Sequence, residues 1–195
     1  MQDWTRRVPG NAQNATEDMQ TGKLSTKDIV LIGAFAAILL IQKELLAFIP
    51  NVSLTVFLIV LYSKAFGMKK TLFILLVYVL LDNIIMGNMG LIFVPFQYIG
   101  WTLIPLLLCT VFKRVNDPLR LALLSALFSF LYCWIMVIPG VIVMHVGVGA
   151  YLAADISFEL VLAASSFVSV LLLYKPCYRV LSALNTGTAP AVRHE

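Results

Sequence analysis

Six long apolar runs constrain this chain more than any motif does. They cover roughly residues 28–49, 53–67, 71–87, 90–112, 119–138 and 150–174. A helix needs about 20 apolar residues to cross a bilayer core, where no water satisfies exposed backbone groups. The sequence therefore predicts an all-α membrane protein with six transmembrane helices. The second run is short, so we expect it to thin the bilayer locally or to lean on its neighbours.

The composition agrees with this fold class. Of the 195 residues, 61% are hydrophobic and 12% are charged, which is far from the balance of soluble globular domains. No internal repeat or low-complexity segment interrupts the apolar runs. We expect a flexible cytoplasmic leader over residues 1–24, one transmembrane domain over 25–180 and a cytoplasmic tail over 181–195.

Local signals mark several ends of the expected helices. Ser25 to Asp28 has the pattern of a capping box at the start of the first helix. Gly67, followed by Met and two Lys residues, separates the second helix from the third. Pro139 and Gly140 are expected to end the fifth helix, and the apolar stretch up to Gly149 is expected to form a partly embedded loop.

The basic residues fall in alternate connections between the apolar runs. They flank the first run, the second turn, the fourth turn and the end of the sixth run: Lys23, Lys27, Lys64, Lys69, Lys70, Lys113, Arg114, Arg120, Lys175 and Arg179. The three remaining turns contain no Lys or Arg. Basic loops stay in the cytoplasm, so this pattern predicts that both termini are cytoplasmic. It also explains the net charge of +4 without a nucleic-acid partner.

A layer of polar side chains lies inside the apolar runs, on the side away from the basic loops. Its members are Gln42, Lys43, Glu44, Asp82, Asn83, Gln97, Asp155 and Glu159. At about 1.5 Å per residue, all of them lie roughly 6–14 Å below the outer surface. A charge at the bilayer centre costs about 2.5–3.5 kcal/mol, so these groups are expected to face one another, water or a ligand.

Helical spacing combines these polar groups with aromatic ones. Asp155 and Glu159 are four residues apart and share a helix face, and Gln97 and Trp101 do the same. Aromatic side chains interleaved with a few convergent polar groups are typical of small-molecule pockets. The sequence therefore predicts a binding chamber that opens to the outside.

A structural interpretation of the same residues stays open. Lys43 paired with Glu44 or Asp82 is then an ion pair between helices, and Gln97 is an interhelical hydrogen bond. Confinement of the layer to the outer half favours a pocket, because helix contacts have no reason to gather there. Other residues have two interpretations each. His145 is a lid contact or an ordinary loop histidine, and Trp101 and Trp134 are pocket residues or interface anchors.

The chain lacks the patterns of the common catalytic sites. It contains no GxxxxGK[ST] and no HExxH motif, and it offers no evident Ser–His dyad at membrane depth. Cys109, Cys133 and Cys177 form no CxxC pair and have no histidine nearby in the sequence. We therefore expect no catalytic residue, no metal site and no cofactor in this chain, and binding is favoured over catalysis.

The inner half of the first run carries a face of small residues. Gly33 and Ala37 are four apart, with Ala34 beside them. Faces of this kind let helices pack closely in lipid. This one lies away from the polar layer, so it is available for another subunit.

These features resemble the substrate-binding S-components of energy-coupling factor (ECF) vitamin transporters. The similarity covers roughly residues 24–180 and includes the small-residue patch Gly33-Ala34-Phe35-Ala36-Ala37. Two further segments look like the family layout: Pro50-Asn51-Val52-Ser53-Leu54 and Phe66-Gly67. The resemblance implies capture of a vitamin or related micronutrient at the cell membrane of a prokaryote. The partners that it implies are a transmembrane T-component, which docks on the small-residue patch, and two cytoplasmic ATPases that use ATP.

Family pockets use the outer parts of spans four to six and the loops after spans one, three and five. The positions that match are Asn51, Gln97, Trp101, Tyr132, Trp134, His145, Asp155 and Glu159. The sequence itself adds Lys43, Glu44, Asp82 and Asn83 as substrate-binding candidates. The acidic excess of the layer suggests a substrate with a cationic or hydrogen-donating group.

Two other functions compete with this interpretation. A structural membrane scaffold of the cell-shape type predicts no bound small molecule. A small proton-coupled secondary transporter uses the intramembrane carboxylates as proton sites and carries substrate without an ATPase.

Overall fold

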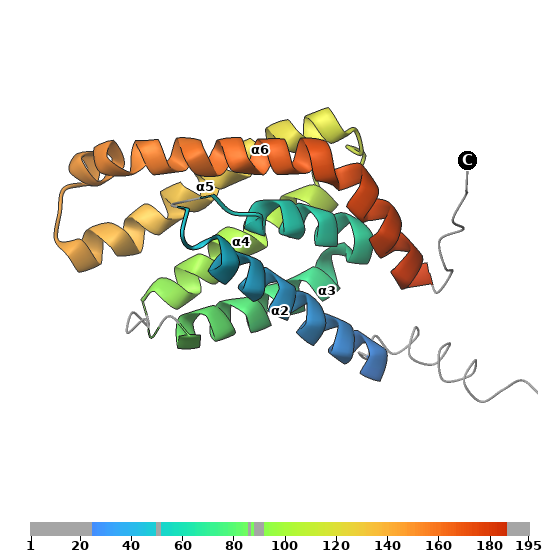
Figure 1. Ribbon diagram of the computed structural model, residues 1–195. Helices are drawn as coiled ribbons and strands as arrows, with labels where there is room; N and C mark the ends of the chain where they lie inside the picture. Colours follow the sequence, from blue (N-terminus) through green and yellow to red (C-terminus); the bar gives the residue numbers. More distant parts are fainter. Residues whose placement is uncertain (1–24, 50–51, 86, 88–91, 187–195) are drawn as a thin grey trace, which may run out of the picture.

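All regular secondary structure in the described part of the chain is α-helical. The computed structural model describes residues 25–49, 52–85, 87 and 92–186, and these contain five α-helices and no strand. The helices are α2 (Thr26–Leu46), α3 (Thr55–Ile85), α4 (Phe93–Cys109), α5 (Pro118–Met144) and α6 (Val148–Thr186), as Figure 1 shows. The all-α prediction is confirmed for these residues. The expected leader and most of the expected tail lie outside them.

Three of the described helices are long and apolar enough to cross a membrane. They are Thr26–Leu46, Pro118–Met144 and the Val148–Ser182 part of α6, and Phe93–Cys109 is apolar but shorter. Large apolar side chains such as Ile41, Leu123 and Leu172 are exposed on the long helices. A surface of this kind suits lipid rather than water, so the helices are compatible with a membrane-embedded protein.

The second and third expected spans are two halves of one broken helix. α3 is interrupted at Gly67, whose φ of 80° and ψ of 174° lie outside the helical region. This positive φ favours glycine, because a Cβ would strain the backbone there. The two halves diverge from this break in Figure 1. The first half, residues 55–66, rises roughly 18 Å, which is short of the ~30 Å bilayer core.

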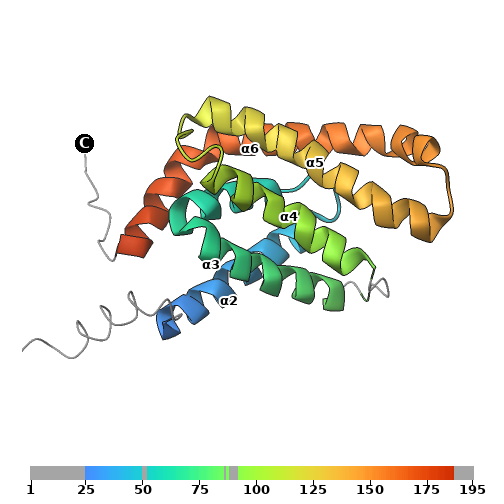
Figure 2. The same ribbon diagram turned by 180° about the vertical axis from the view of Figure 1, so that it is seen from behind.

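α3 is the centre of the bundle. It contacts α2, α4, α5 and α6, whereas α2 makes its helix–helix contacts with α3. Among its fully buried side chains are Tyr62 and Tyr78, one from each half. Phe35 of α2 packs edge-on against Tyr62, with ring centroids 5.0 Å apart. α5 and α6 run antiparallel and pack along each other on one side of this core (Figure 2).

The basic connections gather at one end of the bundle. Lys70, just after the break in α3, forms a 2.7 Å ion pair with Asp28 in the first turn of α2. Lys64, just before the break, donates hydrogen bonds to the carbonyls of Phe112 and Lys113 after α4. The expected capping box is also present here, where the Ser25 backbone N–H donates to Asp28. The α5–α6 turn lies at the opposite end (Figure 1).

The expected end of the fifth helix is wrong. α5 continues through Pro139 to Met144, and His145 ends it in the left-handed conformation with φ 56°. An internal proline removes one backbone hydrogen bond, and neighbouring helices and local adjustment allow a membrane helix to absorb this loss. α6 begins at Val148, so the expected loop up to Gly149 shrinks to a short turn. α6 also continues through Pro176, and its C-terminal part bends away from the rest of the helix in Figure 1.

Candidate binding site

A chain of polar contacts joins α2, α3 and α4. Lys43 forms a 2.5 Å ion pair with Oδ1 of Asp82, and Gln97 donates to Oδ2 of the same carboxylate at 2.8 Å. Asn83 then donates to Oε1 of Gln97 at 2.7 Å. Asp82 is only 3% exposed, yet both of its oxygens have partners. We call Lys43, Asp82, Asn83 and Gln97 the central network.

Local structure explains why these side chains meet. Lys43 lies in the last turn of α2, Asp82 and Asn83 lie near the end of α3, and Gln97 lies near the start of α4. Gln42 fixes the start of α3, because its amide accepts from the Leu54 N–H and donates to the Thr55 hydroxyl. The central network therefore sits where three helix ends converge.

Two cavities border the central network. One has a volume of about 290 Å³ and the other about 320 Å³, and Lys43, Gln97 and Tyr132 line both. The first extends toward the α2–α3 connection, and its lining includes Ser53, Thr55, Tyr78, Trp101 and Leu162. The second is lined by Asp82, Asn83, Phe93 and Met136 in addition to the shared residues. Both volumes lie near the lower end of the range for small-molecule sites.

An aromatic stack forms one wall of the first cavity. The rings of Trp101 and Tyr132 are 3.6 Å apart between centroids and 13° from parallel. Gly100 makes room for this arrangement, since a Cβ there would lie 2.8 Å from Cδ2 of Tyr132. The indole N–H of Trp101 is buried and has no hydrogen-bond partner among the described residues. An unpaired buried donor costs free energy, so a molecule that offered it an acceptor would gain binding energy.

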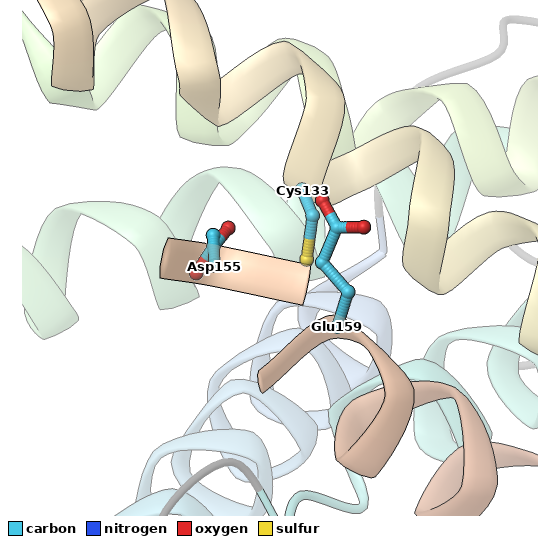
Figure 3. A group of neighbouring side chains, drawn as sticks. All are labelled: Cys133, Asp155 and Glu159. Carbon is cyan, nitrogen blue, oxygen red and sulfur yellow. The ribbon is translucent and has the colours of Figure 1, made fainter. Parts of the chain in front are cut away.

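A second polar group lies between α5 and α6. The Sγ of Cys133 and carboxylate oxygens of Asp155 and Glu159 all lie within 4.8 Å of one another. Figure 3 shows the Cys133 side chain extending from α5 toward the two acidic side chains of α6. Glu159 is only 1% exposed, and its Oε1 has no hydrogen-bond partner among the described residues. We call Cys133, Asp155 and Glu159 the acidic thiol cluster.

A separate cavity adjoins this cluster. It has a volume of about 520 Å³, and its described lining comprises Trp134, Val137, Val148, Leu152, Ile156 and Glu159. Glu159 is the only charged member of this lining. Trp134 is 58% exposed, as an interface anchor would be.

The structure divides the predicted site residues into two groups. It brings Lys43, Asp82, Asn83, Gln97, Trp101 and Tyr132 together around the first two cavities. It sets Trp134, Asp155 and Glu159 apart, beside the third cavity or in the acidic thiol cluster.

The remaining candidates lie elsewhere. Glu44 is exposed on α2, and His145 is exposed at the α5–α6 turn. Asn51 lies outside the described residues. Neither Glu44 nor His145 belongs to the described linings of these cavities.

The predicted set of site residues omits several residues that line the cavities or belong to the acidic thiol cluster. Tyr78 and Met136 carried a usable signal, because each stands four residues from a candidate, Asp82 and Tyr132 respectively. Thr55 carried none, because its place depends on how Gln42 anchors the preceding connection. Cys133 carried none either, because its two acidic neighbours lie on a different helix.

The small-residue face of α2 is open in the described structure. Gly33 and Ala34 are exposed, and Ala37 is half-buried. A Cβ built at Gly33 meets no atom within 4 Å. This face is therefore not used for packing within the described bundle.

Comparisons with known proteins give no relative. No protein-family model, no curated protein and no solved structure matches this chain.

Proposed function

We propose that this chain is the membrane-embedded binding subunit of an ECF-type transporter and captures a vitamin or related micronutrient from outside the cell. The observation that carries this proposal is the pair of cavities around the central network. They combine a stacked Trp101–Tyr132 wall, an unpartnered indole N–H and a few fixed polar groups inside an apolar helical bundle. That combination is what a small-molecule site requires.

The arrangement of the helix ends supports a six-segment topology with both termini in the cytoplasm. The ion pair of Lys70 with Asp28 and the contacts of Lys64 with the segment after α4 bring basic connections to one end of the bundle. In the proposal this end lies in the cytoplasm of a prokaryotic cell, because the positive-inside rule favours a cytoplasmic position for basic loops. The break at Gly67 allows α3 to supply two of the six segments. The central network, at the other ends of α2 and α3, then faces outward.

The chemistry of the cavities favours a neutral, planar ligand. Lys43 and Asp82 are the charged members of the described linings of the two cavities, and they pair with each other. A cationic substrate would find no unpaired carboxylate in these linings. The acidic excess of the sequence therefore does not favour a cationic substrate for this site. The aromatic stack suits a flat ring, and the Trp101 N–H suits an acceptor on its edge.

The exposed small-residue face of α2 supports the proposed partner. Gly33 and Ala34 offer a surface on which another membrane helix can pack closely. In the proposal this partner is the T-component, and the two associated ATPases supply the energy for uptake. The chain then needs neither ATP site nor cofactor of its own.

The first test is native mass spectrometry of gently purified full-length protein, with fragmentation of any small molecule that stays bound. We expect a retained vitamin-like compound whose bound fraction falls in Trp101→Phe and stays unchanged in Trp134→Phe, at the exposed tryptophan. A ligand-free protein that also ignores a panel of vitamins and precursors would favour the scaffold.

Proteoliposomes test the other rival. We expect the chain alone to bind its ligand without accumulating it when a proton gradient is applied. Accumulation driven by that gradient, in vesicles without an ATPase, would instead identify a secondary transporter.

A further inference from the structure

The acidic thiol cluster takes no part in the proposed capture site. None of Cys133, Asp155 and Glu159 lines the two cavities at the central network. Asp155 and Glu159 are four residues apart on α6, so they share the face that packs against α5. Cys133 reaches the same point from α5, and the three ligand atoms lie within 4.8 Å of one another (Figure 3).

The charges of this cluster are uncompensated in the described structure. Neither Asp155 nor Glu159 forms an ion pair with a Lys, Arg or His among the described residues. Glu159 is almost fully buried, and although the Trp134 side chain donates a hydrogen bond to it, its Oε1 lacks a hydrogen-bond partner there. Burial of an unpaired carboxylate costs several kcal/mol or more, so such a group takes up a proton or binds a cation.

The thiol indicates which kind of cation fits. Magnesium and calcium prefer oxygen ligands alone, whereas zinc accepts thiolate and carboxylate together. An organic ammonium ion would bind the two carboxylates without using the sulfur. One sulfur and two carboxylates form a three-ligand set that leaves a fourth tetrahedral position open, as at zinc sites that exchange a ligand.

We propose that Cys133, Asp155 and Glu159 form a binding site for a divalent cation of the Zn²⁺ type. Zn–S and Zn–O bonds of about 2.3 and 2.1 Å place tetrahedral ligand atoms about 3.5 Å apart. The cluster therefore closes slightly when the ion binds. Cys133 loses its thiol proton to solvent in this step, and any proton on the two carboxyl groups leaves with it.

The experiment uses full-length protein in lipid nanodiscs, with Zn²⁺ and Co²⁺ as probes. Calorimetry measures Zn²⁺ affinity, and absorbance detects the thiolate-to-cobalt charge-transfer band in the near ultraviolet. We expect one bound ion for each chain and a cobalt band in the unaltered protein. Cys133→Ser should abolish the band, and both Cys133→Ser and Glu159→Gln should weaken Zn²⁺ binding about tenfold or more.

Cys177→Ala is the matched control, because Cys177 is also half-buried but does not belong to the cluster. It should keep both the band and the affinity. Thermal unfolding of each metal-free variant verifies that it is folded before the ion is added. Absence of binding in the unaltered protein would overturn the proposal. So would unchanged Zn²⁺ affinity in either Cys133→Ser or Glu159→Gln, because the site requires both ligands.

Discussion

The central network and the acidic thiol cluster bury carboxylates in opposite ways. Asp82 has an ion pair on one oxygen and an amide donor on the other, so its charge is compensated and its lone pairs have partners. Glu159 is equally buried and has the Trp134 side chain as a hydrogen-bond donor, but its Oε1 has no partner among the described residues and a thiol and another carboxylate lie beside it. Asp82 and Glu159 both lie in apolar stretches of the sequence. They differ in the side chains that surround them in the structure.

This difference provides a way to distinguish polar side chains that stabilise the fold from those that bind a ligand: whether each buried polar group already has a partner. A compensated network stabilises the convergence of α2, α3 and α4, and it offers a ligand only the atoms left over, such as the Trp101 N–H. A cluster without a counter-charge, such as the acidic thiol cluster, leaves its sulfur and carboxylate oxygens able to bind a cation. Polar groups that already have hydrogen-bond or ion-pair partners therefore fix the geometry of a site. Polar groups without partners indicate which ligand the site binds.

The largest expected effect is that of Asp82→Asn, which keeps the shape of the side chain and removes its charge. Lys43 then loses its ion-pair partner at the edge of a buried network. Loss of one partner of a buried pair costs about 3–5 kcal/mol, and the 31% exposure of the Lys43 side chain reduces this to about 2–3 kcal/mol. Chemical unfolding in detergent, followed by tryptophan fluorescence, measures the change.

A double variant verifies the cause. Lys43→Met combined with Asp82→Asn removes both charges and keeps an amide oxygen as acceptor for Gln97, so it should recover much of the stability that Asp82→Asn alone loses. If Asp82→Asn leaves the free energy of unfolding unchanged, the ion pair does not stabilise the bundle and the comparison fails.

Two glycines allow the packing around the central network to be compared with the packing between α5 and α6. A Cβ at Gly100 would lie 2.8 Å from Tyr132, whose ring is held by the stack with Trp101. A Cβ at Gly140 would lie 2.6 Å from the far end of the Tyr151 ring, and Tyr151 is only half-buried near the start of α6.

We therefore expect Gly100→Ala to cost about 1–2 kcal/mol and to weaken ligand binding, because it displaces the stack. Gly140→Ala should cost less, because Tyr151 has room to move away. Unfolding curves of the two variants, measured side by side, decide the order. Equal or reversed costs would show that the stack at the central cavities is not rigid.

Much of the fold was predictable from the sequence, because lipid permits few solutions for long apolar runs. The capping box at Ser25 and the break at Gly67 were also predictable, since each depends on chemistry within a few residues. The end of α5 was not. Pro139 is typical of a helix end in water, but here the helix continues past it to Met144.

The candidate site was predictable in its residues but not in its grouping. Spacing correctly places Asp155 and Glu159 on one helix face, and the ion pair of Lys43 with Asp82 was one of the open interpretations. Helical periodicity does not tell which faces of different helices meet. One expected chamber is therefore divided between the cavities at the central network and the α5–α6 interface.

A smaller effect is expected from Trp101→Phe, which keeps an aromatic face and removes the indole N–H. If the ligand of the central cavities accepts that hydrogen bond, its affinity should fall about tenfold, equivalent to about 1.4 kcal/mol. The unfolding free energy should change little, because this N–H has no partner in the described structure. Ligand titration of the purified variant measures the first quantity. An unchanged affinity would remove Trp101 from the binding groups.

The smallest expected effect belongs to Glu159→Gln in metal-free buffer. This substitution matches Asp82→Asn in chemistry, since each replaces a buried carboxylate by its amide. No cation loses its partner in this case, because Glu159 forms no ion pair within the described chain. We expect the unfolding free energy to stay within about 1 kcal/mol of the original protein or to rise, because an unpaired buried charge is removed. Chemical unfolding with a chelator present measures this, and a loss as large as that of Asp82→Asn would mean that Glu159 has a stabilising partner. The two carboxylates would then be alike, and the case for a cation at the acidic thiol cluster would lose its electrostatic basis.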